Sequence, residues 1–373
     1  MSSRSKAWLR IYARALAQRA AGARRRRTPR PRRFLIPHHL LLGDTILLTA
    51  TVAKVRAQVP DAEIVHVMPH GHLPLFEGRP YGARALGWNP RDPRSLDPLF
   101  AEAPFDVALV AGDSRYSWLA AAMGAANIVA FEGDRPAYKR WPVTQFVPMP
   151  ASPVSLSDLF STLVPGEPPA PFGPDDWSAP RAAPFERPAG PYVVLHVGAS
   201  VPHKQWSASH WAQLAQSLSA RGLGVCWSAG PGEESIVAAI PGHERFPSFA
   251  GKLGLAQLWH LLADASALVS CDTSVAHLGR VVFVPTLVLF GPSSPVLGGR
   301  GEFWRRCPAQ ELAIDPFECR DQTQLFKRDV PWVRRCTRSL AQCPSARCMQ
   351  ALTVPMVLAA LERLLEGRGR QSA

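Results

Sequence analysis

The sequence predicts an α/β protein with two parallel-sheet domains, and three observations lead to this fold class. Short apolar runs alternate with stretches of helical spacing along most of the 373 residues, as expected when helices connect parallel strands. A proline-rich stretch divides this alternation into two similar halves. The chain is also long enough to bury a hydrophobic core in each half.

The first domain is predicted to span residues 34–147. It opens with the apolar run 34–42, which is expected to be a buried strand, and Gly43-Asp44 follows directly. Periodic apolar residues after this pair indicate a helix. The remaining elements are expected at 45–59 (helix), 63–68 (strand), 105–111 (strand), 116–123 (helix) and 127–131 (strand).

The second domain is expected after a linker. Residues 148–191 contain twelve prolines, and proline lacks the amide hydrogen that helix interiors and central strands need. We therefore predict a linker at 148–190 without helices or central strands, a domain at 191–350, and a closing helix and tail at 351–373. The strands of this domain are expected at 192–197, 223–229, 267–270 and 286–290, and helices at 209–221, 255–263 and 354–365.

Basic residues are concentrated at the start of the chain. Residues 1–33 hold twelve Arg and Lys and no Asp or Glu, which accounts for nearly all of the net charge of +13. Residues 6–16 separate basic from apolar side chains at helical spacing, which predicts an amphipathic helix, and residues 24–33 should be extended because prolines interrupt them. We expect residues 1–33 to dock on an anionic membrane surface and expect no nucleic-acid partner. The alternatives are a disordered solubilising tail, a nucleic-acid-binding arm and an organelle transit peptide.

Cysteine usage and apolar segments indicate the compartment. The chain has seven cysteines, and an odd number in a long chain favours reduced thiols over a disulfide scaffold. The basic start leads into no apolar segment with a cleavage site, and no apolar run is long enough to predict a membrane span. We therefore expect a cytoplasmic protein, held peripherally on the inner face of the cell membrane.

Four segments rich in glycine and polar residues follow predicted strands, where ligands of parallel sheets bind. They are Gly43-Asp44; His196-Val-Gly-Ala-Ser200 with Lys204-Gln-Trp206; Gly230-Pro-Gly-Glu233; and Asp272-Thr-Ser-Val-Ala-His277, followed by Pro285 and Gly291-Pro-Ser293. In this order and spacing, over about residues 34–366, they resemble the heptosyltransferases. These are the inverting transferases of glycosyltransferase family 9 that build the lipopolysaccharide inner core.

The resemblance implies the GT-B architecture, in which two Rossmann-like domains face a central cleft. It places the acceptor in the first domain and the nucleotide sugar, usually ADP-heptose, in the second. The acceptor would be the lipopolysaccharide core or a related molecule. The same architecture also hosts other activities, so the site residues carry the functional argument.

Two residues are the catalytic candidates. The resemblance makes Asp44 the general base that takes the proton of the acceptor hydroxyl, and the alternative is a helix cap, because aspartate is a preferred capping residue. Lys204 can neutralise the leaving diphosphate and so stabilise the charge that develops in the transition state. Its alternative is a solvated surface lysine.

The donor-binding candidates are Ser200, Lys204, Glu233, Asp272, Thr273, Ser274 and His277. By resemblance Glu233 contacts the donor ribose or base, with a plain turn or the neighbouring Glu234 as alternatives. Asp272 to His277 lie at a predicted helix start, which suits a diphosphate, while His277 has a packed helix histidine as its alternative. Ser274 departs from the glycine usual in the family, and His38-His39 depart from its usual polar or basic residue near Gly43.

No metal or cofactor is expected. The sequence has no Asp-x-Asp pair on a plausible loop, and Cys336, Cys343 and Cys348 lack the spacing of paired zinc ligands. The predicted function is an inverting, metal-independent transfer of heptose from ADP-heptose to a lipopolysaccharide-core or related hydroxyl. The alternatives are another nucleotide sugar or a protein acceptor, and a membrane or nucleic-acid binding protein with a degenerate transferase body.

Overall fold

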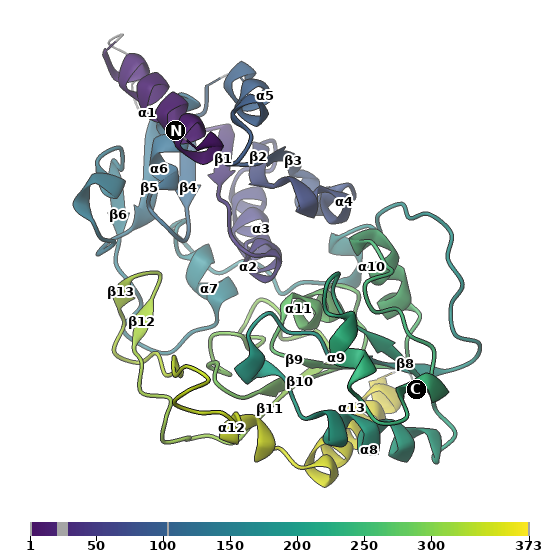
Figure 1. Ribbon diagram of the computed structural model, residues 1–373. Helices are drawn as coiled ribbons and strands as arrows, with labels where there is room; N and C mark the ends of the chain where they lie inside the picture. The colour runs from purple at the N-terminus through teal and green to yellow at the C-terminus, as the bar shows by residue number, and fades with distance from the viewer. Residues whose placement is uncertain (1, 21–28, 103, 372–373) are drawn as a thin grey trace. The chain divides into compact units, whose positions relative to one another are not determined.

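The computed structural model describes residues 2–20, 29–102 and 104–371, and the chain forms two compact units (Figure 1). The N-terminal unit comprises Met1–Ala170, Asp176–Ser178 and Gln324–Pro331. The C-terminal unit comprises Pro171–Asp175, Ala179–Thr323 and Trp332–Ala373. No helix in the described ranges is both long enough and apolar enough to cross a membrane.

The N-terminal unit is built on a six-stranded parallel sheet with the strand order β3-β2-β1-β4-β5-β6. Its strands are β1 (Arg33–Pro37), β2 (Glu63–Pro69), β3 (Arg84–Trp88), β4 (Val107–Val110), β5 (Asn127–Phe131) and β6 (Gln145–Val147). The four strands expected from apolar runs are confirmed. The sequence did not reveal β3 and β6, because most of their residues are only half-buried or exposed and give no continuous apolar signal.

Helices precede, connect and follow these strands. They are α1 (Ser3–Ala20), α2 (Leu42–Leu47), α3 (Thr49–Gln58), α4 (Leu73–Phe76), α5 (Asp97–Ala101), α6 (Tyr116–Ala122) and α7 (Leu156–Ser161). The single helix expected at 45–59 is two helices, α2 and α3, that meet at Leu48.

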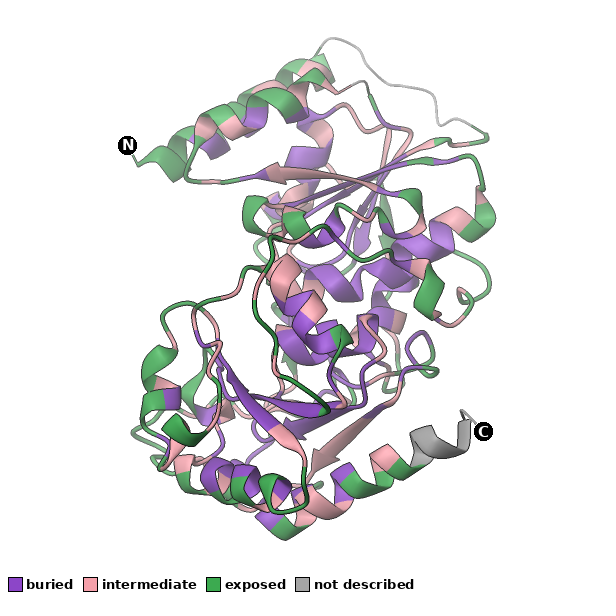
Figure 2. Cartoon of the chain, turned by 90° about the vertical axis from the view of Figure 1, so that its right-hand side faces the viewer, coloured by how far each residue is buried: buried purple, intermediate pink, exposed green. Residues whose placement is uncertain are grey.

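Residues 3–20, which the sequence places in a tail, form helix α1 and pack into the core of the N-terminal unit. Ala7, Trp8, Ile11 and Ala15 are buried in the same cluster as Leu35 of β1, and Figure 2 shows the mixture of buried and exposed residues along this helix. The predicted helix is therefore confirmed, but much of the apolar side expected to face a membrane is occupied by the protein itself. The run Arg24–Arg27 lies outside the described residues.

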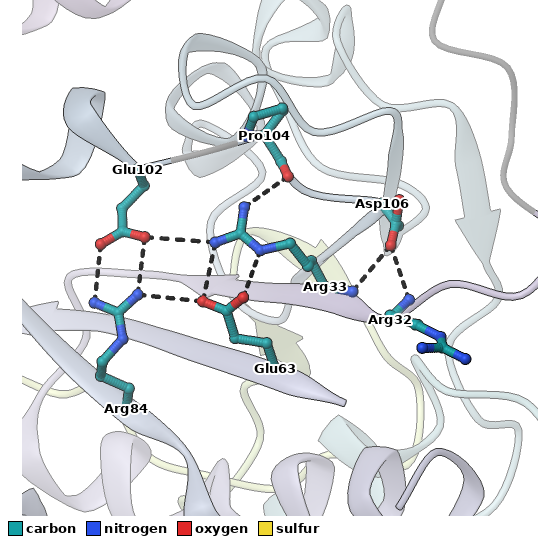
Figure 3. A network of polar contacts seen from close by, with 7 residues as sticks. All are labelled: Arg32, Arg33, Glu63, Arg84, Glu102, Pro104 and Asp106. Atoms are coloured by element: carbon teal, nitrogen blue, oxygen red, sulfur yellow. Dashed lines mark hydrogen bonds and ion pairs between the residues drawn. The ribbon is translucent and has the colours of Figure 1, made fainter. Parts of the chain in front are cut away.

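Arg33, also assigned to the tail, begins β1 and anchors a network at the amino ends of the strands (Figure 3). Its guanidinium donates to Glu63 of β2 at 2.6 Å, and Arg84 of β3 donates to Glu102 at 2.8 Å. The hydrogen bond from Arg33 lowers the pKa of Glu63. A carboxylate of Asp106 accepts the backbone amides of Arg32 and Arg33, so the amino edge of the sheet is fixed by charge.

The predicted linker contains a helix, so the expectation that 148–190 would hold none is wrong for residues 156–161. These residues form α7, and the side chain of Ser155 caps it by accepting the amide of Asp158 at 3.2 Å. Leu159 and Phe160 are fully buried. The reason is local, because the prolines at 153 and 165 flank a proline-free segment with helical apolar spacing.

The C-terminal unit is built on a five-stranded parallel sheet with the order β11-β10-β9-β7-β8. Its strands are β7 (Tyr192–His196), β8 (Gly224–Ser228), β9 (Ala267–Cys271), β10 (Thr286–Phe290) and β11 (Ala309–Ala313). Its helices are α8 (Ala208–Ser219), α9 (Glu234–Ala238), α10 (Leu255–Ala263), α11 (Ser274–Val281), α12 (Arg347–Gln350) and α13 (Val354–Gln371). All four predicted strands and all three predicted helices of this region are present, with small shifts at their ends.

A hairpin from late in the sequence belongs to the N-terminal unit. Strands β12 (Gln324–Leu325) and β13 (Arg328–Asp329) pair antiparallel. Arg328 is buried there and donates to the carbonyl of Glu132 at 2.7 Å and to the hydroxyl of Ser114 at 3.0 Å. The units therefore differ from the continuous domains predicted at 34–147 and 191–350.

Candidate functional site

The candidate residues of the C-terminal unit lie where its strand order reverses. Strand β7 lies between β8 and β9, so the connections that leave β7 and β9 diverge to opposite sides. Ligands of parallel sheets bind beyond the carboxyl ends of strands at such a reversal. Lys204 follows β7 in a short 3-10 turn (Pro202–Lys204), and Asp272 directly follows β9.

Lys204 and Asp272 form an ion pair. The Lys204 ammonium lies 2.7 Å from Oδ2 of Asp272 and donates to its backbone carbonyl at 3.1 Å. Burial alone would raise the pKa of Asp272, but the Lys204 charge and hydrogen bonds from Lys204 and Ser293 outweigh it and lower the pKa. Asp272 is therefore ionised, and the partly exposed ammonium of Lys204 is available to an anionic ligand.

Helix α11 begins beside this pair. Thr273 is the residue before its first turn, in an extended conformation, and no side chain caps the helix. Its hydroxyl lies 3.3 Å from that of Ser270, and Ser274 is the first helical residue. The amides of the first turn have no partner within the helix and carry the positive end of its dipole. These amides can donate hydrogen bonds to a phosphate oxygen.

His277 lies one turn further along α11 and is buried, with an exposed fraction of 7%. Burial and the charge of Arg280 lower its pKa to about 3, so the imidazole is neutral. The charges of Asp272 and Lys204 also act on the ring. His277 therefore lies with Lys204 and Asp272 in one cluster, where its neutral ring can form hydrogen bonds.

Glu233 lies against the end of β7. Its Oε2 accepts the amide of Gly230 at 2.8 Å, and a Cβ added to Gly198 would stand 2.1 Å from the same oxygen. The neighbouring Glu234 instead accepts the amide of Gly232 at 3.1 Å. Of the two acids, Glu233 is thus the one beside the loop that carries Lys204. Ser200 is exposed on that loop and takes no part in the contacts described for Lys204 and Asp272.

Two members of this group, Gly298 and Arg280, were missed from the sequence, and a third, Ser293, was quoted in the Gly291-Pro-Ser293 motif but not assigned to the site. Ser293 follows β10, the strand next to β9, and hydrogen-bonds to Asp272. Gly298 approaches Asp272 so closely that an added Cβ would stand 3.1 Å from Oδ1. Arg280 contacts His277. Ser293 could have been assigned to the site as a hydroxyl that follows a buried strand, whereas a loop glycine and a helix arginine carry no such signal.

Asp44 belongs to the N-terminal unit and follows β1, which lies next to β4 where that sheet's order reverses. It is a half-buried residue of the first turn of α2, and Leu41 occupies the position before that helix. Asp44 is therefore not the N-cap residue considered as its alternative. Its position in the first turn still suits a carboxylate, because the helix dipole favours negative charge there.

The buried His38 and His66 and the half-buried His72 lie near this helix start. His38 accepts the amide of Leu40 on Nδ1 at 3.1 Å, so its Nε2 carries the proton and donates to Nε2 of His66 at 2.9 Å. His72 lies 3.0 Å from the hydroxyl of Thr45, the residue after Asp44. Burial lowers the pKa of His66 to about 3 and of His72 to about 4, and it lowers the pKa of His38 well below its ordinary value. These rings are neutral, and His72 contacts the helix that carries Asp44 through Thr45.

The chain is similar to known proteins in both sequence and fold. The family model of glycosyltransferase family 9 (heptosyltransferase) matches residues 102–301, which is more than half of the chain. The chain belongs to glycosyltransferase family 9. Among the residues that the structure describes, no three His, Cys, Asp or Glu side chains are arranged to hold a metal ion.

The curated relatives are matched over part of their length. Lipopolysaccharide heptosyltransferase 1 of Pseudomonas aeruginosa is 34% identical over 114 residues, which cover 30% of this chain and 32% of that protein. Lipopolysaccharide heptosyltransferase 3 of Escherichia coli is 22% identical over 290 residues, or 70% of this chain and 83% of the relative. In the first of these the matched segment is about a third of the relative.

Solved family structures share the fold over nearly the whole chain. Escherichia coli ADP-heptose lps heptosyltransferase II aligns with a TM-score of 0.66 and 18% identity, covering 91% of this chain and 99% of that chain. An Escherichia coli heptosyltransferase determined with ADP aligns with a TM-score of 0.62 and 16% identity, covering 90% and 98%. The two parallel-sheet units are thus the two Rossmann-like domains of a GT-B fold.

Acidification should destabilise this family member through its buried histidines. The folded pKa of His66, about 3, lies below the ordinary value of 6.5, so between these values the unfolded chain binds a proton that the native protein does not. Stability is complete above pH 6.5 and falls as the pH drops, by up to about 1.4 kcal/mol per pH unit for one fully buried histidine. His66→Gln should therefore show a smaller loss of unfolding free energy between pH 7 and 5, measured by urea denaturation.

The control is His70→Gln, because His70 is exposed to water in the fold. This variant should keep the wild-type pH dependence of stability. Identical slopes for His66→Gln and the wild type would show that His66 is protonated in the native protein.

Proposed function

We propose that this protein is a metal-independent, inverting glycosyltransferase that moves a heptose from ADP-heptose to a hydroxyl of the lipopolysaccharide core or a related acceptor. The observation that carries the proposal is the Lys204–Asp272 pair at the start of α11, placed at the reversal of strand order. Family membership and curated relatives named as lipopolysaccharide heptosyltransferases support the reaction class. An aligned Escherichia coli heptosyltransferase was determined with ADP-2-deoxy-2-fluoro heptose, which supports the choice of donor.

On the donor side, the leaving group is a nucleoside diphosphate whose negative charge grows as the glycosidic bond breaks. The ammonium of Lys204 and the free amides at the start of α11 stabilise this charge. Thr273 and Ser274 add hydroxyl donors, and His277 donates to the sugar or the diphosphate. Glu233 binds the donor ribose or base from its place beside Gly198, and Ser200 contributes from the neighbouring loop.

These groups can take the role that a divalent cation has in metal-dependent glycosyltransferases. A cation would neutralise the diphosphate and orient it. Lys204 carries a positive charge that its pairing with Asp272 partly offsets, and the start of α11 supplies the equivalent of about half a charge. We therefore propose that transfer needs no metal ion and no cofactor.

On the acceptor side, we propose that Asp44 takes the proton of the attacking hydroxyl. A hydroxyl is a weak nucleophile until its proton is removed, and inversion requires the base on the face opposite the leaving group. Asp44 lies where β1 passes into α2, the position at which ligand-binding residues gather in parallel sheets.

We further propose that the protein acts at the inner face of the cell membrane and that α1 contributes to docking there. Leu9 and Leu16, two turns apart on α1, are 56% and 55% exposed. Lys6 and Arg19 are exposed on the same helix. Arg10 and Arg14 instead contact the N-terminal unit itself. Two exposed leucines between basic side chains suit an anionic membrane surface.

Donor choice is tested first by thermal unfolding. ADP or ADP-heptose at about a hundredfold excess over its dissociation constant should raise Tm by about 5 °C, because the ligand binds only the folded state. The shift should persist in excess EDTA. Stabilisation by UDP or GDP compounds alone would favour another nucleotide sugar, and a shift that EDTA abolishes would refute metal independence. A protein that no nucleotide stabilises would be the degenerate binding protein.

Asp44→Asn tests the base. Asparagine keeps the size of aspartate but cannot accept the proton, so kcat should fall by about two to four orders of magnitude. Donor affinity should be unchanged, because the donor residues belong to the C-terminal unit. Asp61→Asn, an exposed aspartate of the same unit, should leave kcat unaltered. A fall in kcat of less than about tenfold would assign Asp44 to structure.

Membrane docking is tested by surface substitution, since removal of residues 1–33 would remove core residues with them. Leu9→Ser with Leu16→Ser should weaken binding to phosphatidylglycerol vesicles by about tenfold or more, without changing Tm. Leu340→Ser, an equally exposed leucine of the C-terminal unit at 52%, is the control. Vesicle binding that neither the double variant nor high salt reduces would contradict the proposal.

A further inference from the structure

Helix α11 carries a buried arginine that the proposed function leaves without a role. Arg280 is 1% exposed and lies one turn after His277. Its guanidinium donates to Nδ1 of His277 at 3.2 Å, and it pairs with Glu311 of β11 at 3.3 Å. The guanidinium therefore contacts one of the residues proposed to bind the nucleotide sugar, His277.

The contact with His277 decides which ring nitrogen carries the proton. A guanidinium only donates hydrogen bonds, so Nδ1 of His277 must accept and hold no proton. A neutral imidazole then carries its single proton on Nε2. Arg280 thus selects one tautomer, whose remaining polar group is a donor.

The same guanidinium holds the loop that approaches Asp272. It donates to the backbone carbonyl of Gly298 at 2.8 Å and to that of Gly299 at 3.1 Å. An added Cβ on Gly298 would stand 3.1 Å from Oδ1 of Asp272 and 2.8 Å from the ring of Phe290. Movement of this loop would therefore change the surroundings of Asp272.

Glu311 braces the arrangement. Its Oε1 also accepts the backbone amide of Arg300 at 2.9 Å, so the carboxylate joins Arg280 to the far side of the loop. A buried arginine paired with a carboxylate, here one whose side chain is 20% exposed, seldom stabilises a protein more than well-packed apolar side chains of the same volume. Arg280 also donates to one histidine and to two backbone carbonyls. These bonds indicate that Arg280 positions its neighbours rather than adding stability.

We propose that Arg280 is a positioning residue for the donor, which holds His277 as the Nε2-protonated tautomer and fixes the Gly298–Gly299 loop beside Asp272. The inference rests on the proposed function and deepens it by adding a residue that acts through His277. The Nε2–H group is then available to donate to the sugar or diphosphate at Lys204 and Asp272.

The test compares Arg280→Met with Arg280→Lys in the full chain. Methionine keeps much of the volume and removes the donors, whereas lysine keeps the charge but cannot reach all the acceptors in one plane. The ring nitrogens of His277 are assigned by nitrogen NMR, with His277→Gln identifying the signals. Arg280→Met should show a mixture of tautomers where the wild type shows the Nε2-protonated form, and Arg280→Lys should be intermediate.

Binding supplies the second measurement. By calorimetry, the Kd for ADP-heptose should rise about tenfold or more in Arg280→Met and less in Arg280→Lys. In the His277→Gln background, Arg280→Met should have a much smaller further effect, because the residue through which it acts is missing. Fully additive losses, or an unchanged tautomer in Arg280→Met, would overturn the inference.

If Arg280→Met does not fold, Glu311→Gln is the second variant, because it removes the charge that pairs with Arg280 without opening a cavity. A partial shift of the His277 tautomer supports the inference, and an unaltered ring with unaltered ADP-heptose affinity refutes it. The NMR measurement needs no donor. Failure of the proposed function, a wild-type protein that does not bind ADP-heptose, is thus distinguishable from failure of the assignment to Arg280.

Discussion

The ion pair between Lys204 and Asp272 joins the loops that follow two neighbouring strands of the C-terminal sheet, and the arrangement of the proposed donor-binding residues depends on it. Lys204 follows β7 and Asp272 follows β9, and the two loops meet because β7 and β9 are neighbours in the sheet. The pair holds both loops in place without a ligand and keeps the ammonium at the start of α11. Topology therefore decides where the positive charge lies, and the carboxylate keeps it in position until an anion competes for it.

A second physical constraint is the need to satisfy backbone carbonyls where parallel strands end. Buried arginines meet it in both units. Arg328 donates to the carbonyls of Gly112, Phe131 and Glu132, after β4 and at the end of β5. Arg320 donates to those of Phe290 and Gly291 at the end of β10, and Arg280 to those of Gly298 and Gly299. One guanidinium satisfies several acceptors at once and stiffens the loops there, since an unpaired buried carbonyl is costly. The loops that carry ligand-binding residues are thereby held by charge as well as by packing.

How much of this could be predicted depends on how local the signal is. Buried strands such as β7 and β10 have continuous apolar runs, and the helix start at Ser274 follows from its neighbours, so both were foreseen. Helix α7 was missed because the abundance of proline around it hid a proline-free segment. The apolar side of α1 was correctly recognised, but its partner was not, because periodicity shows that a face is buried and not what buries it. Arg280 could not be predicted at all, since only the fold brings Glu311 and the Gly298–Gly299 loop to it.

The histidines of the N-terminal unit show why burial matters beside a proposed base. His38, His66 and His72 are kept neutral by desolvation. His38 hydrogen-bonds to His66 and to a backbone amide, and His72 contacts Thr45. A charged imidazolium next to α2 would stabilise a carboxylate there in its ionised form and so weaken it as a proton acceptor. Neutral rings can orient the helix without this effect. Under the proposed function, the charges of the C-terminal unit serve the opposite requirement, because a departing diphosphate needs positive charge that is present before the bond breaks. The proposed base therefore needs neutral neighbours, and the proposed leaving group needs a nearby positive charge. Burial of histidines meets the first need in the N-terminal unit, and the Lys204–Asp272 ion pair meets the second in the C-terminal unit.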